Sequence, residues 1–170
     1  LRGDVPEGAE YPSPDRYAHA SELVEQIRGL GDFCIGGACY PEGHVESSSR
    51  EEDIRHLKEK VDAGCDFLTT QMFFDNDMFR DYLDRIRDVG ITVPVLAGIM
   101  PVTNAGQLRQ INKLSGACLP KRFERLVDKF GDNPPAMMQA GIAYAVEQII
   151  DLIASGVSGI HIYTMNKPEV

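Results

Sequence analysis

Four short apolar runs without polar alternation recur along the chain. They lie at residues 32–39, 67–71, 93–99 and 159–164. Continuous apolar runs of this length are typical of parallel strands that are covered on both faces. Pro94 is compatible with this interpretation because it stands near the start of its run, where no ladder hydrogen bond is lost. Residues 1–2 are interpreted as the end of a further strand.

Amphipathic stretches separate these runs, and we expect each to form a helix with one apolar face. The apolar sets are Leu23, Val24 and Ile27; Ile54, Leu57 and Val61; Phe79, Tyr82, Leu83 and Ile86; Leu108, Ile111 and Leu114; Phe123, Leu126 and Val127; and Ile142, Val146, Ile149, Ile150 and Ile153. Ser21 is expected to cap the first helix, and Asp75 or Asp77 the third.

The alternation of strands and helices predicts an α/β fold built from parallel βαβ units. A doubly wound dinucleotide-binding fold has no support, because no G-x-G-x-x-G turn follows any strand. A (β/α)8 TIM barrel needs about 250 residues and eight strands, and the chain has 170 residues. We therefore interpret residues 1–170 as the later part of a single barrel, an incomplete fragment whose first strands are missing.

Composition narrows the class of protein. Hydrophobic residues make up 43% of the chain and charged residues 25%, as in a soluble globular protein. No run of about 18 apolar residues predicts a membrane span, and the first residues lack the pattern of a secretory signal. Seventeen basic and 26 acidic residues give a net charge of −9, which argues against a nucleic-acid partner.

The cysteines and histidines do not have the spacing of a metal site. Cys34, Cys39, Cys65 and Cys118 form no close pair of ligands, so we interpret them as buried free thiols in a reducing cytoplasm. The four histidines show neither H-x-x-x-H nor H-E-x-x-H spacing. We expect a cytoplasmic protein without a bound metal.

Polar residues follow the expected strands. In a parallel barrel the active site is built at the carboxyl ends of strands. The residues at these positions are Asp4; Tyr40, Glu42 and His44; Gln71 and Asp75; Asn104 and Gln107; and Asn166 and Lys167. Since strands generally lead into polar loops, this selection alone does not separate a binding site from ordinary loops.

One helix carries a further signal. Asp53, His56 and Lys60 recur at spacings of three and four residues, so they share a row beside the apolar stripe of the same helix. A row of carboxylate, imidazole and ammonium groups can grip a diphosphate or a ribityl chain. The alternative interpretation is a solvated helix face, and the spacing leaves both open.

Six motifs occur in order and at the spacing of one known family. They are LRGD at 1–4, YPEGH at 40–44, LKEKVDAG at 57–64, TQMFFD at 70–75, GIMPV at 98–102 and HIYTMN at 161–166. Together they resemble the methylenetetrahydrofolate reductase family, and the resemblance spans essentially the whole chain. It corresponds to the later part of the family's catalytic barrel.

The resemblance implies a flavoprotein of one-carbon metabolism and methionine biosynthesis. Such an oxidoreductase holds FAD non-covalently and reduces 5,10-methylenetetrahydrofolate to 5-methyltetrahydrofolate with NADH or NADPH. The flavin contacts implied by the matched positions are Arg2, Gly3, Asp4, His19, Ala20, Tyr40, His44, Ser47, Asp53, His56 and Lys60. Tyr17 and Ala18 are an alternative to His19 and Ala20. The neighbouring residues 21–24 favour His19 and Ala20.

The implied folate contacts are Asp4, Gln71, Gln107 and Lys167. Lys167 stands where many members carry arginine. The positive charge is kept, but lysine lacks the two parallel N–H donors with which an arginine guanidinium binds a carboxylate. Asp4 and Gln71 are the implied catalytic residues. Gln71 both donates and accepts, which suits the edge of a pterin, and Asp4 is expected to favour the cationic form of the substrate.

The resemblance also carries expectations for the whole protein. Proton delivery is attributed in this family to a glutamate on the first strand, upstream of Leu1, so residues 1–170 alone are expected to be inactive. Exposed strand edges of an incomplete barrel predict a homo-oligomer or a partner subunit. Two other functions stay open: a non-catalytic flavin- or folate-binding fragment or accessory subunit, and a pterin-binding methyltransferase barrel. The row of Asp53, His56 and Lys60 argues against the latter.

Overall fold

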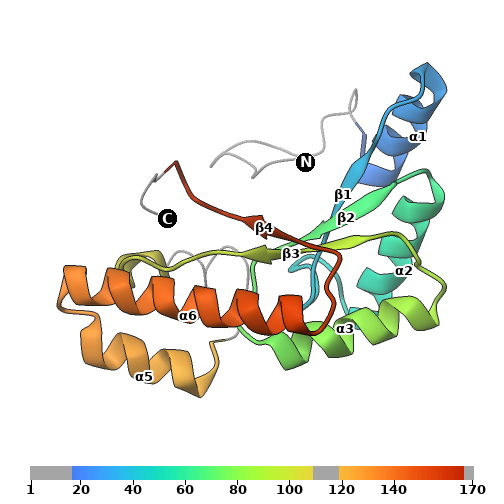
Figure 1. The fold of residues 1–170 in the computed structure, drawn as a ribbon. Helices are drawn as coiled ribbons and strands as arrows, with labels where there is room; N and C mark the ends of the chain where they lie inside the picture. Colours follow the sequence, from blue (N-terminus) through green and yellow to red (C-terminus); the bar gives the residue numbers. More distant parts are fainter. Residues whose placement is uncertain (1–16, 109–118, 167–170) are drawn as a thin grey trace.

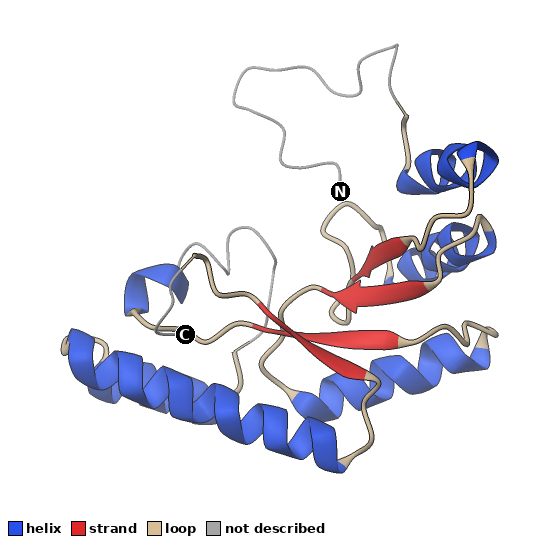
Figure 2. Cartoon of the chain, turned by 45° about the horizontal axis from the view of Figure 1, so that its top comes forward, coloured by secondary structure: helices blue, strands red, loops and turns tan. Residues whose placement is uncertain are grey.

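The computed structural model of the chain describes residues 17–108 and 119–166. Four parallel strands form one sheet in the order β1-β2-β3-β4. The strands are drawn in red in Figure 2. Their bounds are β1 Gly36–Cys39, β2 Phe67–Thr70, β3 Val95–Ile99 and β4 Gly159–Ile162. Each predicted apolar run among the described residues therefore contains a strand, and the expected parallel α/β sheet is confirmed.

Helices connect the strands at the expected places (Figure 1). Their bounds are α1 Ala20–Leu30, α2 Arg50–Asp62, α3 Asn76–Asp88, α5 Lys121–Phe130 and α6 Pro134–Ala154. Residues 105–108 are also helical, where a helix was expected from Leu108 onward, and residues 109–118 lie outside the described part of the chain.

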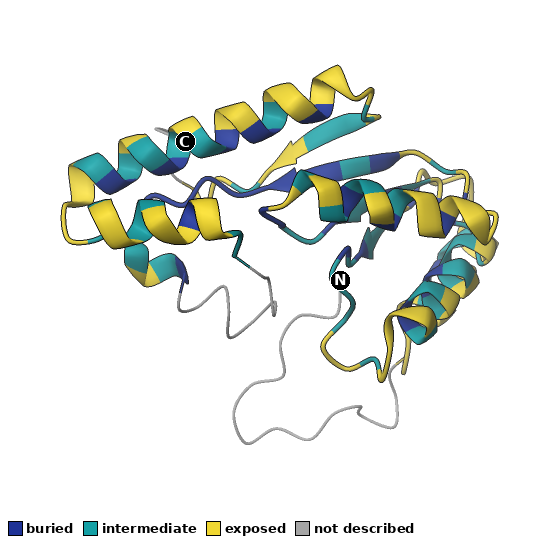
Figure 3. Cartoon of the chain, turned by 90° about the horizontal axis from the view of Figure 1, so that it is seen from below, coloured by how far each residue is buried: buried dark blue, intermediate teal, exposed yellow. Residues whose placement is uncertain are grey.

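One face of the sheet packs against α2, α3 and α6. The buried layer contains Leu68, Val95, Ala97 and Ile99 from the strands, together with Leu57, Phe79, Tyr82, Ile86, Ala145 and Leu152 from the helices. Figure 3 shows that the buried sides of these helices face the sheet and their exposed sides face outward. The opposite sheet face is covered less completely by the described residues, so the expectation of strands buried on both faces holds only in part. On β4, both His161 and Ile162 are exposed.

The start of α1 differs from the sequence prediction. The first helix begins at Ala20 with His19 as its N-cap, so the prediction that Ser21 caps it is wrong. The Glu22 carboxylate accepts from the backbone N–H groups of Ala18 and His19, at 2.7 and 3.3 Å, which fixes the earlier start. At α3 the expected cap is confirmed, because the Asp75 side chain accepts from the backbone N–H groups of Asp77 and Met78.

The first strand begins at Gly36, four residues later than its apolar run. Ile35 N–H donates to the Asp66 carboxylate at 2.7 Å, so a side chain replaces a ladder partner there. Cys34 lies before the strand and is exposed, so its predicted burial is wrong. Cys39 and Cys65 are buried free thiols, as expected. Cys118 lies outside the described residues.

The inward face of α6 was predicted wrongly in part. Ile149 packs partly buried against the core, as expected. Val146, Ile150 and Ile153 are 48%, 62% and 62% exposed. The buried residues are instead Met137, Gly141, Ala145, Gln148 and Leu152. Apolar residues occur on nearly every side of this helix, so periodicity does not single out one face. The close approach of the α6 backbone to Val102 determines which face is buried, because a Cβ at Gly141 would lie 1.8 Å from the Val102 carbonyl oxygen.

No helix among the described residues combines the length and apolar character needed to cross a membrane.

We predict that Gly141→Ala destabilises the protein by about 1–3 kcal/mol, because the added methyl group forces α6 away from the Val102 backbone. Urea unfolding followed by circular dichroism measures the change. Gly29→Ala in α1 is the matched control, since among the described residues no atom beyond its chain neighbours and its own helix backbone lies within 4 Å of the added Cβ. This control should stabilise the protein by up to about 1 kcal/mol. Equal effects of the two substitutions would contradict the packing argument.

Candidate functional site

The loop between β1 and α2 folds back on itself beside the end of β1. Gly43 N–H donates to the Tyr40 carbonyl at 2.9 Å, and Ser47 N–H to the His44 carbonyl at 3.0 Å. Gly43 has a φ of +92°, a conformation that favours glycine. These two turns bring the rings of Tyr40 and His44 into edge-to-face contact, with centroids 4.6 Å apart. Two predicted flavin contacts therefore lie together.

The same loop delivers Ser47 to the first turns of α2. Ser47 Oγ donates to Asp53 Oδ1 at 3.3 Å, and Ser49 caps the helix by accepting from the Glu52 N–H. Asp53 is only 8% exposed. Two turns further along, Lys60 Nζ donates to the Ala38 carbonyl of β1 at 2.7 Å. Asp53 is thus directed toward the loop between β1 and α2, and Lys60 toward the sheet, so the predicted row is not an ordinary solvated face.

Burial shifts the titration of both charged groups in opposite directions. It raises the pKa of the Asp53 carboxyl. Hydrogen bonds from Ser47 and the His44 backbone, and the charges of His44 and Lys60, lower this pKa in part. Burial also lowers the pKa of the Lys60 ammonium. Cys39 beside it has a pKa raised by burial to about 12, so that thiol is neutral at pH 7. Asp53 is the carboxylate whose charge opposes, in part, the effect of burial on Lys60.

The third member of the row, His56, lies against the start of α1. The rings of His19 and His56 are stacked with centroids 6.2 Å apart. A nitrogen of Arg55 lies 3.0 Å from His56 Nε2. His19, with Ala20 next to it, therefore lies beside the α2 row, whereas sequence spacing alone left Tyr17 and Ala18 as an alternative.

Gln71 follows the end of β2 and lies beside the end of β1. Its backbone N–H donates to the Cys39 carbonyl at 2.7 Å, and its side-chain Oε1 accepts from the Met72 N–H at 3.2 Å. The side-chain amide oxygen is therefore turned toward the following peptide. The –NH2 group is the end of this side chain that is available to a ligand as a donor.

Gln107 has a structural task within its own loop. Its Oε1 accepts from the backbone N–H groups of Thr103 and Asn104, at 2.8 and 3.2 Å, and from the Thr103 hydroxyl at 3.2 Å. The carbonyl end thus closes the turn after β3. As with Gln71, only the –NH2 group is left to meet a ligand.

Four predicted site residues lie outside the described part of the chain: Arg2, Gly3, Asp4 and Lys167. Their roles stay predictions. Among the described residues, no three His, Cys, Asp or Glu side chains gather as they would to hold a metal ion.

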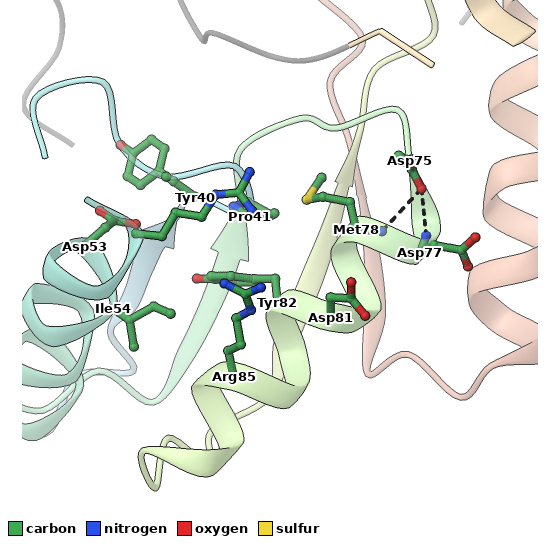
Figure 4. A pocket seen from close by; sticks show the side chains of 12 residues that line it. Tyr40, Pro41, Asp53, Ile54, Asp75, Asp77, Met78, Asp81, Tyr82 and Arg85 are labelled. Atoms are coloured by element: carbon green, nitrogen blue, oxygen red, sulfur yellow. Dashed lines mark hydrogen bonds between the residues drawn. The ribbon is translucent and has the colours of Figure 1, made fainter. Parts of the chain in front are cut away.

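A cavity of about 260 Å³ adjoins this cluster between α2 and α3 (Figure 4). Tyr40 and Asp53 form part of its wall. Of the residues in its lining, the sequence had indicated only these two and Asp75 as candidate site residues. Four aspartates and two arginines line it, namely Asp53, Asp75, Asp77, Asp81, Arg50 and Arg85. Because carboxylates outnumber guanidiniums, this cavity does not select a diphosphate, and Lys60 outside its lining is the better partner for one.

Comparisons with known proteins agree on one family. The family model described as methylenetetrahydrofolate reductase matches residues 1–170. Methylenetetrahydrofolate reductase 1 of Schizosaccharomyces pombe is 38% identical over 169 residues, covering 98% of this chain and 28% of the relative. 5,10-Methylenetetrahydrofolate reductase of Escherichia coli is 34% identical over 170 residues, covering 100% and 56%. Methylenetetrahydrofolate reductase (NADH) 1 of Zea mays is 37% identical over 186 residues, covering 99% and 31%. The chain thus spans between about a quarter and just over half of these relatives.

A solved structure shares the fold. It is an uncharacterized protein from Clostridium thermocellum, described as binding two copies of 5-methyl-5,6,7,8-tetrahydrofolic acid. The TM-score is 0.55 at 19% sequence identity, over 81% of this chain and 50% of that one. At this identity the likeness concerns the arrangement of strands and helices alone.

We predict that Asp53→Asn raises the free energy of unfolding of the ligand-free protein at pH 7. Since burial raises the pKa of this carboxyl in the folded state, ionised Asp53 opposes folding at any pH above that raised value. The gain should shrink as the pH falls through the raised pKa, and disappear below the ordinary range of an aspartate, where the carboxyl is protonated in both states. Urea unfolding at several pH values measures it.

The control for this experiment is Asp62→Asn on the outer side of α2. Asp62 is exposed and accepts from Lys58 Nζ at 2.5 Å. Removing such a surface ion pair should lower the free energy of unfolding by about 0–1 kcal/mol. A loss of stability for Asp53→Asn at pH 7 would show that Ser47, His44 and Lys60 outweigh the burial of the charge.

Proposed function

Because the chain belongs to the methylenetetrahydrofolate reductase family, we propose that its protein reduces 5,10-methylenetetrahydrofolate to 5-methyltetrahydrofolate. The observation that carries this proposal is the match of the family model to all 170 residues. Electrons come from a reduced nicotinamide, NADH or NADPH, and the name of the maize relative specifies NADH. The chain corresponds to part of that protein, since it spans 56% of the bacterial relative.

The fold supports a barrel for the whole protein. Strand neighbours in the sheet are also neighbours along the chain, and α2, α3 and α6 all cover the same sheet face. This is the arrangement of consecutive βα units in a (β/α)8 barrel, in which helices form the outer ring. We assign residues 1–170 to the later units of this barrel. The carboxyl ends of the strands, where Tyr40 and Gln71 follow β1 and β2, then face the active site.

The residues around α2 fit FAD as the resident cofactor. The Lys60 ammonium is largely withdrawn from water and has three N–H donors, and its one hydrogen bond within the described residues goes to Ala38. A phosphate is a suitable acceptor for the other two donors. Tyr40, His44, Ser47, Asp53 and His56, with His19 and Ala20, are assigned as the other flavin contacts among the described residues, and Arg2, Gly3 and Asp4 are assigned to the same group. When bound, FAD supplies the hydride carrier between nicotinamide and folate.

The folate is assigned to Gln71 and Gln107, together with Asp4 and Lys167. Both glutamines have their carbonyl end engaged by backbone N–H groups, so each presents its –NH2 group as a donor. Such donors suit the carbonyl and ring-nitrogen acceptors of a pterin. Lys167 offers a positive charge to the substrate's glutamate carboxylate, and Asp4 stabilises positive charge that develops on the folate.

The full-length protein that carries this chain tests the reaction directly. We expect it to be yellow after purification, to lose the flavin absorbance when NADH or NADPH is added without oxygen, and to regain it on addition of methylenetetrahydrofolate. Failure to bind FAD on titration would overturn the cofactor assignment. Flavin that is reduced by nicotinamide and never reoxidised by the folate would overturn the substrate assignment.

A pair of lysines on α2 tests the diphosphate contact. Lys60→Met should raise the Kd for FAD about 10- to 100-fold, as expected for one or two charge-assisted hydrogen bonds. Lys58→Met is the matched control, because Lys58 pairs with Asp62 on the outer side of the same helix. Its Kd should stay within about twofold of the unmodified protein. Quenching of flavin fluorescence on binding measures both, and similar Kd values for the two variants would contradict the assignment.

A further inference from the structure

The peptide unit between Thr70 and Gln71 is held from two sides. Its N–H group, on Gln71, donates to the Cys39 carbonyl of β1 at 2.7 Å. Its carbonyl group, on Thr70, accepts from the Tyr163 hydroxyl at 2.8 Å. One peptide plane is therefore fixed between the first strand and the residue that follows the last one. The direction in which the Gln71 side chain leaves the backbone depends on this plane.

Tyr163 reaches this peptide because β2 and β3 separate early. Their register pairs end at Thr69 and Leu96, whereas β1 pairs with β2 as far as Thr70, and β3 pairs with β4 as far as Ile99. Beyond Thr69, hydrogen bonds from side chains replace those of the ladder. The Thr70 hydroxyl oxygen accepts from the Gly98 N–H at 2.8 Å. The Tyr163 hydroxyl donates to the Thr70 carbonyl.

The phenol crosses β3 at a glycine. A Cβ at Gly98 would lie 2.8 Å from Tyr163 Cε2 and 2.3 Å from the Thr70 carbonyl oxygen, so glycine at this position lets the ring pass. Tyr163 is held at its own backbone by a hydrogen bond from its N–H to the Ile99 carbonyl at 2.9 Å. The His161 ring lies edge-on to it at 4.7 Å. These contacts hold the Tyr163 ring in place, and the ring determines the position of its hydroxyl group.

We propose that Tyr163 is a positioning residue for Gln71, acting through the Thr70–Gln71 peptide plane. This inference depends on the proposed role of Gln71 in folate binding. Loss of the hydroxyl leaves the Thr70 carbonyl without its donor from the β4 side, so the plane is fixed only by its bond to Cys39. The Gln71 –NH2 group then loses its fixed aim, and small misplacements of a substrate-orienting group slow a reaction strongly.

The hydroxyl remains a donor at neutral pH. Burial raises the pKa of the Tyr163 phenol above its ordinary value, and the neighbouring Cys39 and Tyr40 act in the same direction. The contribution of Tyr163 is therefore independent of pH across the neutral range.

The test compares two tyrosines that make the same type of bond. The Tyr144 hydroxyl donates to the Phe74 carbonyl at 2.8 Å, three residues beyond Gln71. In the flavin-loaded full-length protein, Tyr163→Phe should slow reoxidation of the flavin by methylenetetrahydrofolate about tenfold, with the Kd for FAD unchanged within about twofold. Tyr144→Phe removes an equivalent hydrogen bond and should leave this rate within about twofold. Equal effects of both variants on the rate would overturn the proposal.

A double-mutant cycle separates positioning from a general structural effect. In a Gln71→Ala background, Tyr163→Phe should lower the rate by less than about twofold, because the residue that it positions is already absent. A further loss as large as in the unmodified background would show that Tyr163 acts independently of Gln71.

Hydrogen exchange supplies a readout that does not depend on activity. The Gln71 amide should exchange about five- to tenfold faster in Tyr163→Phe, since the lost hydrogen bond loosens its peptide plane. In Tyr144→Phe its exchange should be unchanged. If the unmodified protein does not turn over methylenetetrahydrofolate, the proposed function fails while this measurement still reports on the peptide. Unchanged exchange of Gln71 in Tyr163→Phe would overturn the positioning role.

Discussion

Burial of one face of a parallel sheet is the constraint on which the rest of the molecule depends. Leu68, Val95, Ala97 and Ile99 are at most 1% exposed beneath α2, α3 and α6. Once these side chains are placed, the two-residue period of a strand sends the intervening residues to the other face. Parallel strands also end at a common edge. The residues that follow them are therefore brought together, although they are far apart along the chain.

Charged groups beside this core are placed by the same packing. Because α2 lies against β1, the row that begins at Asp53 is partly withdrawn from water, and Lys60 reaches the strand backbone at Ala38. Burial disfavours the charged form of both groups, and the attraction between them offsets this only in part, so they reduce stability in the folded protein. Binding sites commonly contain such groups, because a ligand that completes their hydrogen bonds recovers the lost solvation.

Side-chain hydroxyl groups complete the sheet where its ladder stops. Between β2 and β3, Thr70 and Tyr163 take over hydrogen bonds that a longer strand pair would make. These replacement bonds hold the backbone in place where the ladder ends. Further along the same loop, Gln148 and Tyr144 from α6 donate to the carbonyls of Phe73 and Phe74. The loop that carries Gln71 is therefore held by the last two described elements of the chain.

Local pattern and motifs in the sequence determined the parallel α/β class, the approximate places of all four strands, and the family. The charged row on α2 was also visible, because helical spacing alone puts Asp53, His56 and Lys60 on one side. Only the tertiary structure decided which side of α6 is buried, since that helix is apolar nearly all round and the contact of Gly141 with the Val102 backbone fixes its rotation. The link from Tyr163 to Thr70 likewise has no local signal, because it depends on strand register across 93 positions of the chain.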